Sequence, residues 1–215
     1  MTSAIDLVLV LVVVLDLVVL ASSRLRGAIR TVALQGALLS LLPVLLATGG
    51  QAPLHVLLLA LGALVVKGVA IPGLMLWAMR EAAIRREAEP IVGFVPSLLL
   101  GAAGTVVAFS LSGALVLPAP GRQALLVPAA LVTAWAGLLL VMTRRKAVAQ
   151  VLGFLVLENG IFVFGLLIAD VMPVMVEAGV LLDLFAAVFV MGIVMFHINR
   201  EFSSLDTGRL THLQD

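Results

Sequence analysis

Long apolar runs, separated by short polar loops, fill this sequence from one end to the other. Each run has about 20 residues, the length that a helix needs to cross some 30 Å of hydrocarbon. Apolar residues make up 63% of the 215 residues and charged residues only 12%, about half the charged share of a soluble domain. The sequence therefore predicts an all-α integral membrane bundle with little soluble structure of its own.

The runs define seven transmembrane spans, and the loops between them carry Gly, Pro and charged residues. We place the spans at residues 5–22, 31–48, 54–79, 91–117, 124–143, 148–169 and 173–199. Together they form a predicted transmembrane domain over residues 1–200. A polar segment follows at residues 201–215, which we interpret as a cytoplasmic tail.

The basic residues predict the orientation of this bundle. The loops after the first, third and fifth spans, together with the tail, contain Arg24, Arg26, Arg30, Arg80, Arg85, Arg86, Arg144, Arg145, Lys146, Arg200 and Arg209. The opposite loops contain only Arg122. Since positive charge marks the cytoplasmic side, we expect a multi-pass protein of the cell (inner) membrane with its amino end outside and its carboxyl end in the cytoplasm.

A weak internal similarity relates the two halves of the sequence. RLRGAIRTVALQGALL and RRKAVAQVLGFLVLENGIF both run from a basic loop into a helix with one polar residue at mid-depth. This alignment matches Gln35 with Glu158. It suggests a degenerate three-helix repeat that relates spans 1–3 to spans 5–7, as in many transporters.

The sequence lacks the residues that several kinds of chemistry require. The chain has no cysteine, which excludes disulfides, thiolate-bound clusters and cysteine nucleophiles. His55 and His197 lie at span ends and His212 lies in the tail, so a haem held between helices has no histidine ligand at depth. The net charge of +1 argues against nucleic acid as a partner, and no nucleotide-binding motif is present. We expect no cofactor, no metal and no active site in this chain.

The informative residues are the few charged side chains inside the bilayer, because each costs about 2.5–3.5 kcal/mol at the membrane centre. Glu158 lies twelve positions after Lys146, about 18 Å into the membrane, and Lys67 is equally deep. Asp16 lies nearer the cytoplasmic edge of the first span, and Asp183 lies in the outer half of the seventh. We assign these four ionisable residues to a candidate proton pathway, since intramembrane ionisable groups are functional by default.

Neighbouring residues support this assignment. Asn159 adds a hydrogen-bonding amide beside Glu158, and Gly160 allows close helix approach. Pro72 removes a helical hydrogen bond and favours a kink near Lys67. Gln35 and Thr31 are compatible with a water chain but are more typical of helix packing.

The alternative reading is structural. Glu158 can be a neutral, hydrogen-bonded acid. Lys67 can form a structural ion pair with Glu158 or Asp16.

Three segments carry a resemblance to a known family: QVLGFLVLENGIFVFGLL in the sixth span, KGVAIPGLM in the third, and SSLDTGRLTHL in the tail. With them the chain resembles the hydrogenase-4 component E family, membrane subunits of complex I-like hydrogenases such as formate hydrogenlyase. Spans 5–7 also look like the small three-helix subunit of complex I and of multisubunit sodium/proton antiporters, whose mid-membrane glutamate corresponds to Glu158. The second glutamate of that subunit would fall near Val188, and Asp183 is the nearest acid.

The resemblance implies a non-redox subunit in the membrane arm of an oxidoreductase complex. It would pack beside antiporter-like subunits, would be coupled to a peripheral hydrogenase or related module, and would contribute a proton-transfer segment. Two alternatives remain: a purely structural scaffold of the membrane arm, and a stand-alone secondary transporter of cations or protons.

Overall fold

The structure of the chain is a computed structural model that describes residues 2–47, 53–81, 91–114, 125–168 and 192. Within these residues every regular element is a helix. The elements are α1 (Thr2–Ala21), α2 (Leu25–Ser40), α3 (Leu42–Leu46), α4 (Leu54–Ala63), the π-helix η1 (Leu64–Ala70), α5 (Ile71–Glu81), α6 (Phe94–Ala114), α7 (Leu126–Thr143) and α8 (Ala147–Ile168). The predicted all-α fold is confirmed for this part of the chain.

Within the described residues, six stretches of helix are long and apolar enough to cross a membrane: Ala4–Ala21, Leu25–Leu46, Leu54–Trp77, Phe94–Gly113, Leu126–Thr143 and Val148–Leu167. They lie at the first six predicted spans, and they make the protein a multi-pass membrane protein. The seventh predicted span (173–199) and the predicted tail (201–215) lie outside the described residues. The three-helix repeat, which needs the seventh span, therefore stays a prediction.

The predicted start of the second span differs from the structure by several residues. The second span was expected from residue 31, whereas α2 begins at Leu25 and includes Arg26 and Arg30. A helix does not end where its apolar run ends, because long basic side chains extend to water while their stems lie along the helix. The same span contains a break, since a turn at Leu41 separates α2 from α3, and Pro43 stands in the first turn of α3.

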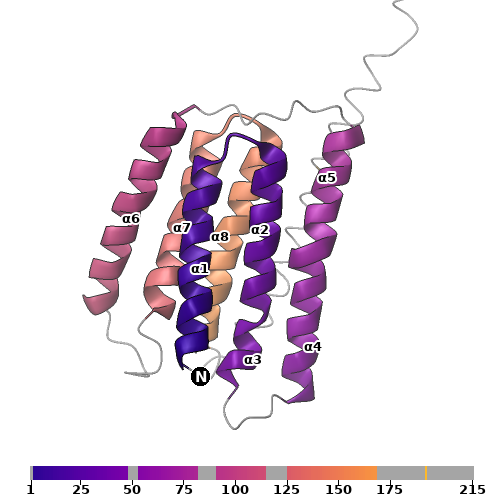
Figure 1. The fold of residues 1–215 in the computed structure, drawn as a ribbon, viewed down its shortest axis with the longest axis vertical. Coiled ribbons are helices and arrows are strands. Elements are labelled where there is room, and N and C mark those ends of the chain that lie inside the picture. Colours follow the sequence, from indigo (N-terminus) through magenta and orange to yellow (C-terminus); the bar gives the residue numbers. More distant parts are fainter. Residues whose placement is uncertain (1, 48–52, 82–90, 115–124, 169–191, 193–215) are drawn as a thin grey trace, which may run out of the picture.

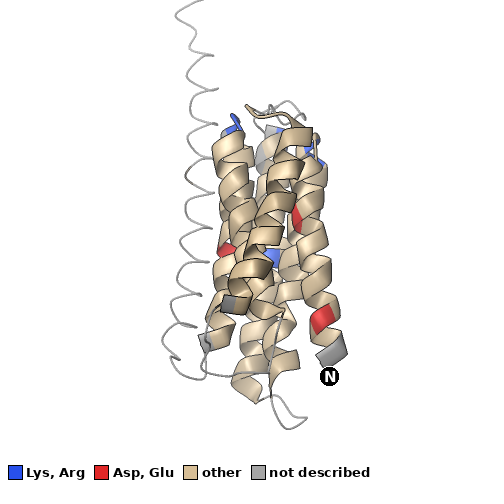
Figure 2. Ribbon diagram, turned by 90° about the vertical axis from the view of Figure 1, so that its left-hand side faces the viewer, with Lys and Arg blue, Asp and Glu red and all other residues tan. Residues whose placement is uncertain are grey.

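The helices stand side by side as an up-and-down bundle (Figure 1). In it α1 packs against α2, α6 and α7, and α8 packs against α7 and α2. The segment α4–η1–α5 lies along α2 at one edge of the bundle, and α6 lies at the other. Lys and Arg gather at the end of the bundle opposite the amino terminus (Figure 2), which we call the basic end.

The interior consists of two apolar clusters with polar residues between them. The cluster nearer the basic end includes Val19, Val32, Ala136 and Val156. The other cluster includes residues on the same four helices, at Val12, Leu39, Ala130 and Val163. Asp16, Gln35, Thr133 and Glu158 fall between these positions along α1, α2, α7 and α8. The charged and amide side chains thus form one layer across the middle of the bundle.

Candidate functional site: a buried polar layer

Six buried side chains from α1, α2, η1, α7 and α8 form one continuous set of hydrogen bonds, which we call the polar layer. Its members are Asp16, Gln35, Lys67, Thr133, Glu158 and Asn159. All are at most 6% exposed. Because the members come from distant parts of the sequence, the layer exists only when the bundle is assembled.

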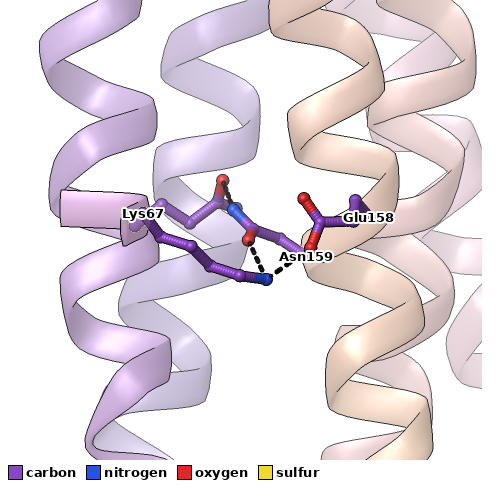
Figure 3. A network of polar contacts seen from close by, with 4 residues as sticks. Lys67, Glu158 and Asn159 are labelled. Atoms are coloured by element: carbon purple, nitrogen blue, oxygen red, sulfur yellow. Dashed lines mark hydrogen bonds and ion pairs between the residues drawn. The ribbon is translucent and has the colours of Figure 1, made fainter. Parts of the chain in front are cut away.

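The centre of the layer is an ion pair between Lys67 and Glu158 (Figure 3). Lys67 Nζ lies 2.7 Å from Glu158 Oε1 and donates a second hydrogen bond of 3.3 Å to Asn159 Oδ1. Its ammonium also lies 4.7 Å from the centre of the Phe162 ring, within the range of a cation–π contact. The lysine therefore has a carboxylate, an amide oxygen and an aromatic face around it.

The layer continues from Asn159 to the carboxylate of Asp16. Asn159 Nδ2 donates to Gln35 Oε1 at 3.3 Å, and Gln35 Nε2 donates to Asp16 Oδ1 at 2.7 Å. The other carboxylate oxygen, Asp16 Oδ2, accepts a 2.7 Å bond from Thr133 Oγ1. Asp16 is fully buried and both of its oxygens are hydrogen-bonded, an arrangement that makes burial of an ionised carboxylate tolerable.

Local backbone structure brings Lys67 to this position. Pro72 has no N–H to give to the carbonyl four residues earlier, and the helix before it widens into the π-helix η1, in which the N–H of Ile71 bonds to Val66 O. Gly36 on α2 lies directly against the lysine: a Cβ there would be 2.8 Å from Lys67 Cβ. The predicted disturbance by Pro72 thus takes the form of a π-helical turn, a feature frequent at functional sites.

The backbone contact between α7 and α8 positions Glu158 and Asn159. Cβ atoms at Gly153 and Gly160 would approach Val141 N and Ala134 N to 2.6 and 2.5 Å. A Cβ at Gly137 would clash with the backbone of Leu157. Small residues allow membrane helices this approach, and it sets the depth and rotation of α8 relative to α7. Gly160, predicted as a close-approach point, has that role.

Glu158 has one oxygen without a partner among the described residues. Oε1 is paired with Lys67, whereas Oε2 is buried and accepts no hydrogen bond from this part of the chain. An ion pair at this depth exists because attraction offsets the cost of removing two charges from water. A carboxyl with a free buried oxygen and one cation beside it can gain or lose a proton according to where that cation lies.

Four of the residues expected from the sequence thus meet directly: Lys67, Glu158, Asn159 and Gln35. Asp16, expected on the pathway, joins them through Gln35. Thr31 does not, because its hydroxyl bonds to Gly27 O within its own helix. Asp183 lies outside the described residues.

Sequence reasoning missed Thr133 and Phe162. Thr133 carried a signal, since it is the one hydroxyl in the middle of the apolar span 124–143, at a depth similar to that of Asp16. Phe162 carried none, since it is one of nine phenylalanines. No group of three or more His, Cys, Asp and Glu in the described ranges could hold a metal ion.

The fold and the layer together define a class: a multi-pass helical membrane protein with an ion pair and a second carboxylate buried at mid-bundle. Comparison with known sequences gives a relative. The chain is 36% identical over 194 residues to the uncharacterized protein Rv0085 of Mycobacterium tuberculosis. The aligned region covers 89% of this chain and 87% of the relative. The chain belongs to the family of that protein. No protein-family model and no solved structure matches it.

Proposed function

We propose that this protein is a non-redox subunit of the membrane arm of a complex I-like hydrogenase or related oxidoreductase complex. Its contribution is a proton-transfer segment centred on Glu158 and Lys67. The proposal rests on the resemblance to the hydrogenase-4 component E family and on one observation, the buried Lys67–Glu158 ion pair in the polar layer. The basic end of the bundle faces the cytoplasm in the cell membrane, and antiporter-like subunits and a peripheral module are its partners.

The chemistry follows from the contacts of the lysine. While Lys67 lies against Glu158, the carboxylate stays charged; when the ammonium moves toward Asn159 Oδ1 and the Phe162 ring, Glu158 loses its counter-ion and takes a proton. Glu158 Oε2, which accepts no hydrogen bond from the described residues, is the oxygen that would receive it. Return of the lysine expels that proton. Charge movement in a neighbouring subunit would drive the cycle.

A second candidate, a structural scaffold, is supported by the other half of the layer. Asp16 has both oxygens occupied, and its bonds to Gln35 and Thr133 tie α1 to α2 and α7. Buried polar groups with every bond satisfied can fix helix register without moving protons. The two functions differ in what they require of Glu158.

Glu158→Gln separates them, because glutamine keeps the size of the side chain and can still accept a hydrogen bond from Lys67, but it cannot ionise. We expect membranes that carry the variant to lose proton translocation while the complex stays assembled and still transfers electrons. Asp6→Asn, on the first helix and partly exposed, is the matched control and should translocate normally. Unchanged translocation by the assembled Glu158→Gln complex would leave the scaffold as the function.

A further inference from the structure

The hydrogen bonds of the polar layer all run in one direction between Lys67 and Asp16. The ammonium donates to Asn159, the amide of Asn159 donates to Gln35, and the amide of Gln35 donates to Asp16. A cation thus stands at one end of the series and a carboxylate at the other. Each amide turns its oxygen toward the cation and its NH₂ toward the anion, the orientation that both end charges favour.

Side-chain amides in this arrangement carry polarisation and not protons. An amide has a separate donor group and acceptor group, and neither exchanges its proton with a neighbour as a carboxyl or a water does. Aligned hydrogen bonds strengthen one another in a medium of low dielectric constant. The Gln35–Asn159 pair therefore connects the charge of Asp16 to the oxygen that faces Lys67, although no proton passes along it.

Among the described residues, the two amides are the hydrogen-bonded link between Asp16 and the ion pair. The helices packed on α1 offer it Gln35 from α2 and Thr133 from α7, while α3 and α6 have no charged residue. At the basic end, α2 carries Arg26 and Arg30. The guanidinium of Arg144 bonds to Leu20 O, one turn beyond Asp16 on α1. Of the cations in the described ranges, Lys67 is the one that Asp16 reaches through hydrogen bonds at its own depth.

We propose that Asp16 is a second counter-anion of Lys67, and that the amides of Gln35 and Asn159 transmit its charge to the lysine. One lysine then serves two carboxylates, one in direct contact and one through two amides. An ionised Asp16 polarises Asn159 Oδ1 and draws the ammonium toward it, which favours the state with the proton on Glu158. A neutral Asp16 returns the ammonium to Glu158, which favours the charged pair. The two carboxyls titrate as a coupled set. The inference rests on the proposed role of the Lys67–Glu158 pair.

The protein offers a direct probe, since it has only two lysines, Lys67 and Lys146. Labelling with ¹⁵N-lysine in lipid nanodiscs gives two Nζ signals, and Lys146→Arg assigns them. Asp16→Asn removes the charge but keeps an oxygen that can accept from Gln35. We expect it to move the Lys67 signal at fixed pH. In a Gln35→Met background, where the amide series is broken, the same change should move that signal far less, and this non-additivity measures the coupling.

Two further variants keep the test decisive. Asn159→Leu breaks the series at the other amide and replaces Gln35→Met if that variant does not fold. Thr133→Val removes the bond to Asp16 Oδ2 and leaves the amides intact, so the effect of Asp16→Asn should persist there. Asp6→Asn should leave the Lys67 signal in place.

Two results would overturn the proposal. One is a Lys67 signal that does not respond to Asp16→Asn. The other is an equal response with and without Gln35, which would mean that the charge acts directly through space. Neither result depends on transport, so the coupling can fail while Glu158→Gln still abolishes translocation, and it can hold while translocation is unaffected.

Discussion

Gly36 is the residue that lets α2 approach the lysine. A Cβ on it would lie 2.8 Å from Lys67 Cβ and 3.3 Å from the carbonyl oxygen of the same residue. Real Cβ atoms do not approach a backbone-anchored carbon so closely, and neither neighbour is the free end of a flexible side chain. Because Gly36 has no Cβ, α2 can approach Lys67 closely enough to hold Gln35, the preceding residue on α2, beside the ion pair.

Gly36→Ala should lower stability by about 1–3 kcal/mol, the usual cost of overpacking a well-packed interior. Gly27→Ala on the same helix is the matched control, because the nearest atom to its Cβ would be Ser22 Oγ at 3.8 Å. There alanine should be neutral or should stabilise the helix by up to about 1 kcal/mol. Thermal unfolding of both variants in detergent checks this. Equal stability of the two would mean that α2 can move away from Lys67 without cost.

At the scale of elements, the contact between α7 and α8 sets the geometry of the site. The two helices meet backbone to backbone through glycine and alanine, and a Cβ added at Gly153 would lie 2.9 Å from Gly137 O. Membrane helices gain no hydrophobic driving force from contact with each other, so close packing has to hold them together. Any side chain at this contact separates the helices and moves Glu158.

Gly153→Ala is therefore expected to lower the unfolding temperature and to shift the Lys67 Nζ signal, since α8 carries both carboxylate and amide partners of the lysine. Gly62→Ala in α4 is the control: it is exposed, and nothing lies within 4 Å of its Cβ among the described atoms. An unchanged lysine signal in Gly153→Ala would show that the position of α8 does not depend on this contact.

The sequence predicts the depth of a site residue in the membrane better than it predicts the rotation of its helix. Depth is predictable, because a helix rises 1.5 Å per residue from a basic loop, and this placed Lys67 and Glu158 at one level. Rotation is not, because the apolar runs have no marked polar face, and which helices touch depends on packing. The pairing of Gln35 with both Asp16 and Asn159, and the role of Thr133, follow from rotation and came only from the structure.

At the scale of the whole molecule, the two ends of the bundle differ in positive charge. Lys and Arg gather at the end opposite the amino terminus (Figure 2). The apolar helices define a membrane protein, and the positive-inside tendency predicts that the basic end is the cytoplasmic one. Because the chain has no native cysteine, single cysteines can test this orientation without removing any.

Ser23→Cys lies between α1 and α2 at the basic end, and His55→Cys lies in the first turn of α4 at the other; both positions are exposed. A thiol reagent that cannot cross membranes should label intact cells at residue 55 and leave residue 23 unmodified. After permeabilisation both should react, which controls for reactivity. The reverse pattern would invert the orientation and put the amino end in the cytoplasm.

The polar layer cannot form all at once, because its members are synthesised at different times. Asp16 and Gln35 are 19 residues apart and can pair as soon as the first two helices are inserted. Lys67 and Glu158 are 91 residues apart, an interval of roughly 5 to 20 s at a synthesis rate of about 5–20 residues per second. Throughout that interval the lysine is in the membrane without its carboxylate. Insertion of α8 is therefore the step that brings Glu158 to Lys67, and a chain arrested before it would hold the lysine in the membrane without this carboxylate.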